Sequence, residues 1–352
     1  MGAIHVHSTH SDGTGRPDEI ARAAQEAGLD FLVITDHNNA GARQTFGERR
    51  VGGLVVLVGA ELTPLKNHYL ALGFSGACPP HQLGPADAIR RVRAKGGFGF
   101  VAHPADPGNA FLRLMDFSWP DRSDLGFEGI EIWNLQSAWS ESTRNLRQAV
   151  TTFLHPERAV GAPAGEVLAW WDHLGRTRPV AALAGVDAHA VKVRRVFGLV
   201  RFTAFPYARV FRMLQTGVQV EGDGPGDFPT ERRRILDALR TGRAFMVRRT
   251  LGAASGFRFV YRGSRRAEMG DEIPAGPGVF RVHAPAPGEI RLLRNGVPVA
   301  RGDAPDLTCP SVGPGVYRVE VWRRARDVSV PWIYSNAIYL RPGDGVEPGH
   351  DR

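Results

Sequence analysis

Short apolar runs alternate with amphipathic stretches over the N-terminal two-thirds of this chain. The apolar runs predict strands at residues 4–7, 31–35, 54–58, 69–73, 98–102, 129–133, 180–186 and 197–202. Pro residues at helix starts and Gly residues at helix ends predict helices from Pro17 to just before Gly28, over residues 85–95 and over residues 235–241. Alternating strands and helices are typical of a parallel sheet, and this number of strands favours a closed or nearly closed α/β barrel.

The pattern changes near residue 245, where helices give way to short strands separated by Gly and Pro turns. Strands are predicted at residues 257–261, 279–283, 289–294, 315–322 and 333–340, and Arg294-Asn295-Gly296 is typical of a tight hairpin. We therefore expect an α/β domain over residues 1–245. A small Ig-like β-sandwich should follow over residues 246–342, and then a flexible tail over residues 343–352.

Composition narrows the class of protein. Hydrophobic residues make up 43% of the 352 positions, which suits a soluble globular protein with a real core. No run of about 18 apolar residues predicts a transmembrane helix. No leader sequence is visible before His5, so we expect a cytoplasmic protein that does not contact membranes. Cys78 and Cys309 fit no zinc or redox spacing.

The formal net charge of +8 comes almost entirely from arginine, because the only lysines are Lys66, Lys95 and Lys192. Such uniform use of arginine first indicates the base composition of the genome. A positive charge also favours a small anionic substrate. A nucleic-acid-binding surface is the alternative, but the arginines form only short groups, such as residues 232–234.

The first chemical motif is His5-Val-His7, followed by Asp12-Gly13. Side chains two residues apart on a strand share a face, so His5 and His7 should point the same way. Asp12 should follow in the next loop. Two imidazoles beside a carboxylate are typical ligands of a divalent transition metal.

Further histidines and carboxylates follow the carboxyl ends of the predicted strands, which is the rim where α/β barrels build their active sites. Asp187 and His189 repeat the spacing of His5 and His7, so both should face one centre. The sequence therefore predicts a polynuclear metal site. Its further candidate residues are His37, Glu61, His68, His103, Glu131, Asp187 and His189.

These residues fall in the motifs His-x-His-x4-Asp-Gly, Thr-Asp-His, Gly-x-Glu, Ala-His-Pro and Gly-x-Asp-x-His, in that order. Over roughly residues 3–245 the chain resembles the polymerase and histidinol phosphatase (PHP) superfamily. The resemblance implies a distorted (βα)7 barrel that holds three divalent metal ions, with Glu61 shared between two of them. The implied ligand sets are His5, His7, Glu61 and Asp187; Glu61, His68 and His103; and Asp12, His37 and His189. Many members have His where this chain has Asp12.

Two features resemble the carbaryl-hydrolase-like (CehA/McbA) branch of that superfamily. Phosphatase-like members usually have Asp after Thr-Asp-His, whereas this chain has Asn38. The C-terminal segments Leu-Leu-Arg-Asn-Gly-Val and Trp-Ile-Tyr-Ser-Asn-Ala-Ile-Tyr are also similar to that branch. The resemblance implies hydrolysis of a carbamate ester as one activity.

No Gly-rich phosphate loop, serine elbow or Cys/His pair stands out, so we expect chemistry led by metal ions. A metal-activated hydroxide at a trinuclear zinc, manganese or iron site should cleave a phosphoester. The alternatives are a carbamate, ester or amide hydrolase and a non-catalytic metal-binding scaffold. The candidates for proton transfer are Asp187, His189 and His103, and those for substrate binding are His10, Glu131, Arg194 and Arg195. Asp36 should support a ligand or a loop.

Overall fold

The structure is a computed structural model that describes residues 1–63, 66–79, 84–196, 200–220, 222, 224, 226–325 and 327–343. For residues 192–196 and 200–202 it describes the backbone alone. The predicted tail lies outside the described residues except for Gly343. Of the described helices, none combines the length and hydropathy that a membrane crossing requires.

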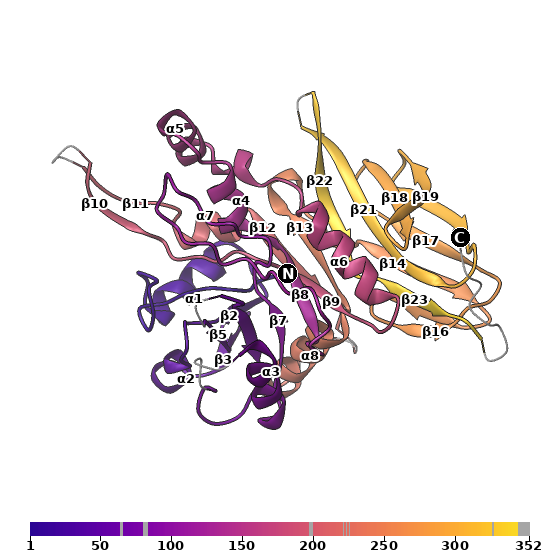
Figure 1. The fold of residues 1–352 in the computed structure, drawn as a ribbon, viewed down its shortest axis with the longest axis horizontal. Coiled ribbons are helices and arrows are strands. Elements are labelled where there is room, and N and C mark those ends of the chain that lie inside the picture. Colours follow the sequence, from indigo (N-terminus) through magenta and orange to yellow (C-terminus); the bar gives the residue numbers. More distant parts are fainter. Residues whose placement is uncertain are drawn as a thin grey trace.

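The N-terminal strands fall into two sheets (Figure 1). One contains β12 (Leu214–Val218), β1 (Gly2–Ala3), β2 (Phe31–Ile34), β4 (Leu54–Val58) and β3 (Arg49–Val51). The other contains β5 (Ala60–Leu62), β6 (Tyr69–Leu72), β7 (Phe98–Val101), β8 (Gly129–Asn134) and β9 (Ala181–Gly185). Strands β1, β2 and β4 are parallel, as are β7, β8 and β9, whereas β6 is antiparallel to both neighbours. The sheets are therefore mixed rather than purely parallel.

Within the described residues the two sheets do not join into one continuous barrel ladder, so the mixed α/β class is confirmed and the expected distorted (βα)7 barrel is not. They meet instead through isolated bridges, from Val6 to Ala188 and from His37 to Glu61. The segment expected as a strand at residues 4–7 continues β1 as irregular backbone, with His5 at a φ of 66°. Left-handed conformations interrupt a regular ladder, and they are uncommon for residues with side chains.

Nine helical segments cover the described N-terminal part: α1 (Pro17–Glu26), α2 (Gly41–Thr45), α3 (Pro85–Ala94), α4 (Leu135–Glu141), α5 (Leu146–Leu154), η1 (Pro156–Ala159), α6 (Gly165–Gly175), α7 (Tyr207–Phe211) and α8 (Phe228–Thr241). The predicted helices correspond to α1, α3 and α8. The other helical segments were not predicted. Among them, α4 and α5 begin directly after the N-cap residues Asn134 and Asn145, without a Pro or Gly signal. Each Asn side chain accepts a hydrogen bond from the backbone three residues on, which stabilises the first turn.

Strand β13 (Ala244–Arg248) lies at the predicted domain boundary and belongs to both parts of the chain. It pairs with β12 on one side and with β22 (Val328–Ser335) on the other. The sheet then continues through β21 (Gly315–Ala325), β23 (Ile338–Arg341), β18 (Glu289–Arg294), β19 (Val297–Gly302) and β16 (Glu272–Pro274). A four-stranded sheet of β15 (Arg266–Glu268), β14 (Arg258–Gly263), β17 (Gly278–His283) and β20 (Asp306–Pro310) shares a buried core with it.

The short elements η2 (Arg249–Leu251), β10 (Lys192–Val196) and β11 (Val200–Thr203) complete the described fold, with β10 and β11 paired to each other. The strand predicted at residues 333–340 divides into β22 and β23 at Asn336. The Asn336 side chain donates to the carbonyls of Ala182 and Ala244, at 2.8 and 2.9 Å, and accepts from the Ala182 N–H at 2.7 Å. It therefore fastens the C-terminal strands to β9.

A buried ion pair makes a second connection between the two parts. Helix α6 lies between the N-terminal and the C-terminal strands (Figure 1). The Arg318 guanidinium on β21 donates to both carboxylate oxygens of Asp172 on α6, at 2.8 and 2.9 Å. It also donates to Glu320, at 2.6 Å. A planar guanidinium matches a carboxylate in this two-point geometry, so the contact fixes the orientation of α6.

Candidate metal centre

His5 and His7 are fully buried and turn their Nε2 atoms toward the same two carboxylates. His5 Nε2 lies 3.2 Å from Glu61 Oε2 and 3.5 Å from Asp187 Oδ1. His7 Nε2 lies 3.4 Å and 3.2 Å from the same two atoms. The side chains of His5 and His7 converge as predicted, but the alternation of side chains along a regular strand is not the cause. Left-handed backbone at His5 and at Asp187, with φ of 66° and 50°, aims the side chains inward.

The Glu61 carboxylate is the central group of the cluster. Its Oε1 atom lies 2.9 Å from His68 Nδ1 and 3.0 Å from His103 Nε2. Its Oε2 atom faces His5 and His7, and lies 3.0 Å from His37 Nδ1. One buried carboxylate therefore contacts imidazoles from five histidines, and its two oxygens face different subsets of them.

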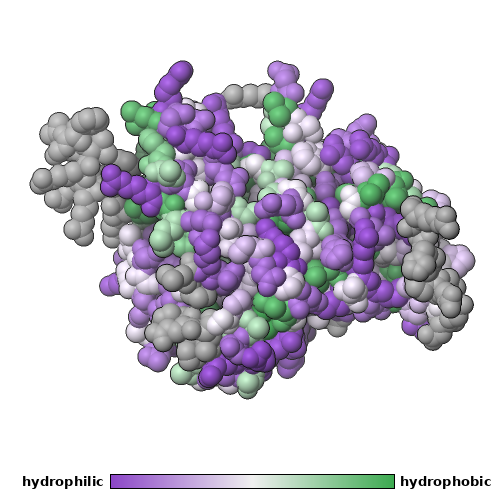
Figure 2. Space-filling model, viewed as in Figure 1, coloured by the Kyte–Doolittle hydropathy of each residue, from purple (hydrophilic) through white to green (hydrophobic). Residues whose placement is uncertain are grey.

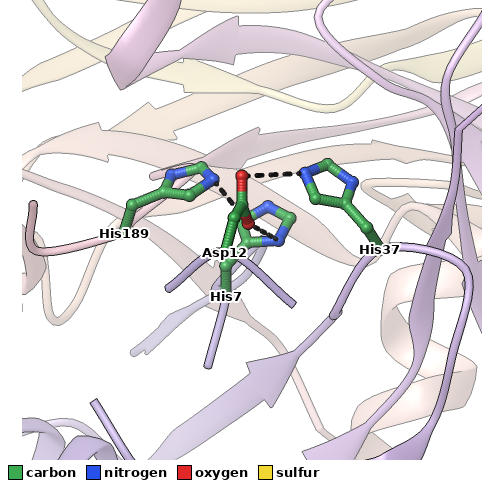
Figure 3. A group of neighbouring side chains, drawn as sticks. All are labelled: His7, Asp12, His37 and His189. Carbon is green, nitrogen blue, oxygen red and sulfur yellow. Dashed lines mark ion pairs between the residues drawn. The ribbon is translucent and has the colours of Figure 1, made fainter. Parts of the chain in front are cut away.

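Asp12 organises a third group at the outer edge of the cluster. Figure 3 shows its carboxylate between His189 and His37, with His7 beside it. Asp12 Oδ1 lies 3.2 Å from His189 Nε2, and Oδ2 lies 3.5 Å from His37 Nε2. Gly13 allows the loop to turn back here, because a Cβ atom at this position would lie 2.1 Å from the His7 carbonyl oxygen. Asp12 is the most exposed member of the group.

Glu131 lies behind the cluster, although the sequence placed it among the substrate-binding candidates. Its Oε1 accepts a hydrogen bond from His5 Nδ1 at 2.8 Å, and its Oε2 accepts from the His103 backbone N–H at 2.7 Å and from Asn134 at 3.0 Å. With 1% of its surface exposed, Glu131 orients His5 and leaves Nε2 of that ring for a metal. A Cβ atom at Gly185 would lie 1.6 Å from Glu131 Oε1, so only glycine leaves room for this carboxylate.

We predict that Glu131→Gln weakens metal binding about 10- to 100-fold, because the amide cannot accept from His5, His103 and Asn134 at once. Competition with a chelator for zinc measures the change. Glu166→Gln, at an exposed surface carboxylate, should keep the original affinity. A raised KM with unchanged metal affinity would instead place Glu131 at the substrate.

Two further residues fix the loops that carry the ligands. Asp36 accepts hydrogen bonds from the Ser8 backbone N–H and hydroxyl and from the Ser11 hydroxyl, all at 2.7 Å, as its expected supporting role requires. The Tyr207 hydroxyl lies 2.8 Å from the His7 carbonyl and 3.1 Å from the His189 carbonyl. Tyr207 was not among the predicted residues, because it stands in no motif and is 200 residues from His7.

Charges within the cluster shift the protonation of its members. Burial disfavours a charged imidazole, yet the contacts of His103 with Glu61 outweigh it and raise the pKa of His103 to about 9. Burial is likewise outweighed at His37 by Asp12 and Glu61, which raise its pKa to about 10. At His7, burial and the nearby His189 lower the pKa to about 4. A metal binds neutral imidazole, so metal binding at neutral pH must release protons from His37 and His103.

The donor set fits divalent transition metals. Within the described part of the chain, six buried atoms of the cluster have no hydrogen-bond partner: His5 Nε2, both ring nitrogens of His7, His37 Nδ1, His103 Nδ1 and Glu61 Oε2. Buried polar atoms without a partner are costly, and imidazole and carboxylate donors facing each other are the ligands that such cations prefer. All nine residues predicted as metal ligands lie in this cluster.

The remaining substrate-binding candidates are not part of the cluster as described. His10 Nε2 lies 2.8 Å from the Thr45 hydroxyl, so its ring faces α2. Arg194 and Arg195 lie on β10, and their side chains fall outside the described residues. Their expected contact with an anionic substrate stays a prediction.

Comparison with known proteins finds a family model that matches part of the chain. Residues 3–94 match the model of the PHP domain. This PHP match contains the segments that carry His5, His7, Asp12, His37, Glu61 and His68. His103, Glu131, Asp187 and His189 lie beyond it, and only the folded structure brings them to the same place.

Individual relatives are more distant. The chain is 26% identical over 143 residues to the uncharacterized protein MJ1587 of Methanocaldococcus jannaschii. The aligned region covers 37% of this chain and 80% of that protein. A two-domain protein of Bacteroides vulgatus containing a predicted PHP-like metal-dependent phosphoesterase is 16% identical. Its TM-score is 0.41, with 96% of this chain and 94% of that chain covered. For an amidohydrolase of Chromobacterium violaceum the identity is 17% and the TM-score 0.30, with coverages of 53% and 87%.

Proposed function

We propose that this protein is a metal-dependent hydrolase that cleaves a phosphoester at a trinuclear site. The observation that carries the proposal is Glu61, whose two oxygens face separate groups of histidines in a buried cluster. His5, His7, Glu61 and Asp187 would hold one ion. Glu61, His68 and His103 would hold a second, and Asp12, His37 and His189 a third. Bound divalent ions lower the pKa of a coordinated water toward neutrality and neutralise charge that develops on the substrate.

Among the three candidates for proton transfer, His189 is the best placed. Its Nδ1 donates to the Asp187 carbonyl at 3.0 Å, which leaves Nε2 as the basic nitrogen of the ring. His103 is enclosed beside Glu61. Burial opposes ionisation of Asp187, but its histidine neighbours outweigh burial and hold the pKa of Asp187 far below its usual range. His189 Nε2 faces Asp12, so a third cation and a transferred proton would compete for this atom.

Hydrolysis of a carboxyl or carbamate ester, as in the carbaryl-hydrolase-like branch, is the second candidate. Two features of the sequence support this candidate. Asn38 follows Thr35-Asp36-His37 where phosphatase-like members usually have Asp, and the C-terminal segments are similar to those of that branch.

A substrate panel on metal-loaded protein tests these proposals. Protein loaded separately with zinc, manganese or iron should hydrolyse bis-p-nitrophenyl phosphate, and elemental analysis should find up to three ions per chain. A variant with both His5→Ala and His7→Ala should lose at least one ion and its turnover. Activity on 1-naphthyl methylcarbamate alone would favour the second candidate. Full metal content without any turnover would support a non-catalytic scaffold.

A further inference from the structure

A cavity of about 640 Å³ opens directly beside the metal centre. It lies between α4, α5, the segment after β9 and the residues around Phe205. Its volume falls within the range of about 300–1,000 Å³ that is usual for small-molecule sites. Asp187 and His189 form part of its wall, so a group bound here reaches the side chains of the centre.

The rest of the wall is apolar, and its side chains include Trp139, Val150, Phe205 and Met213. The Trp139 and Phe205 rings meet edge to face with centroids 4.8 Å apart. Among the lining residues that the structure describes, none is a lysine or arginine. Besides Asp187 and His189, the polar side-chain groups of the wall are the Gln136 amide and the Trp139 indole N–H. A sugar or nucleoside bound here would leave most of its own polar groups unpaired, whereas a hydrocarbon group carries none.

The mouth of the cavity is also apolar. Leu146, Val150 and Leu154 are four residues apart along α5 and therefore share one helix face. They are 72%, 52% and 58% exposed, and all three line the cavity. Figure 2 shows hydrophobic side chains on the surface over α5. This surface leads from solvent into the cavity and toward His189.

We propose that this cavity binds a bulky apolar group of the substrate while the scissile bond lies at the metal centre. The inference rests on the proposed hydrolase function and specifies its substrate class as an ester with a large hydrocarbon or aryl substituent. We assign the cavity to a part of the substrate because its wall contains both apolar side chains and two of the proposed metal ligands, Asp187 and His189. A second copy of the chain covering α5 is the competing occupant.

Calorimetric titration with butanol, hexanol and octanol tests the cavity without requiring turnover. Affinity should rise about fourfold for each added methylene group, as for burial of a CH2 group. Val150→Asp places a charge at the mouth and should weaken octanol binding at least tenfold. Val297→Asp, at a similarly exposed valine on β19, should bind octanol as the unmodified protein does. Leu146→Asp serves as a second mouth variant if Val150→Asp is poorly folded.

Turnover separates this inference from the proposed function. Methyl and octyl p-nitrophenyl phosphate share the scissile bond, and kcat/KM should be at least tenfold higher for the octyl ester. Turnover of both esters at equal rates, without octanol binding, would overturn the inference and keep the hydrolase. Octanol binding without turnover of any ester would count against the proposed function instead. A dimer that Val150→Asp dissociates would assign the surface to a second copy and overturn the inference.

Discussion

Glu61→Gln should lower kcat on the order of 10³-fold and remove at least one metal ion per chain. The amide keeps the size of the side chain but loses the negative charge that holds five imidazoles. Losing several kcal/mol of charge stabilisation corresponds to a rate change of about this size. Elemental analysis and kinetics on bis-p-nitrophenyl phosphate measure the two effects.

The matched control for this substitution is Glu128→Gln. The Glu128 carboxylate accepts hydrogen bonds from Arg93 at 2.8 Å and from the Gly99 backbone N–H at 3.0 Å. It precedes β8, whereas Glu131 and the metal centre lie farther along that strand. We expect this variant to keep its metal content and kcat. Full metal content and rate in Glu61→Gln would show that the carboxylate is not the shared ligand.

Asp172→Ala should lower the free energy of unfolding by about 3 kcal/mol, the lower end of the range for breaking a buried ion pair. The lower end applies because Glu320 remains as a partner of Arg318. Both side chains of the Asp172 pair are nearly fully buried, so solvent cannot replace the lost contact. Urea denaturation followed by circular dichroism measures the loss.

Asp124→Ala provides the comparison, because Asp124 pairs with Arg178 in the same two-point geometry, at 2.7 and 2.6 Å. This pair is about one-third exposed, so its loss should cost about 1 kcal/mol or less. Equal losses in the two variants would mean that burial does not strengthen the Asp172 contact.

More of the candidate site than of the surrounding fold could be predicted from the sequence. Residues such as His37, Glu61 and His103 follow apolar runs, and the ends of neighbouring strands meet at one edge, so their proximity follows from local patterns. The supporting contacts do not follow from such patterns. In the sequence, Glu131 lies near the end of a predicted strand, just as the metal-ligand candidates do. Only its contacts with His5 and the His103 backbone show that it lies behind the cluster.

The fold shows the same limit. Apolar runs located most strands, but no local signal reveals that His5 and Asp187 adopt left-handed backbone and interrupt the barrel ladder. Helices α4 and α5 depend on asparagine caps that resemble loop residues in the sequence. The divided strand at Asn336 depends on contacts with Ala182, which is 154 residues away. The divided strand is therefore decided by tertiary partners, whereas the asparagine caps are local contacts made by a residue type that is equally common in turns.

Because β13 is hydrogen-bonded on both sides, a protein cut after Arg248 would keep this strand with one bare edge. Unprotected edges recruit strands from other molecules, so the isolated N-terminal fragment would be prone to self-association. A hinge at this boundary would require a row of backbone hydrogen bonds to break. Exchanging the C-terminal part for an unrelated module would therefore require another strand to cover the freed edge of β13.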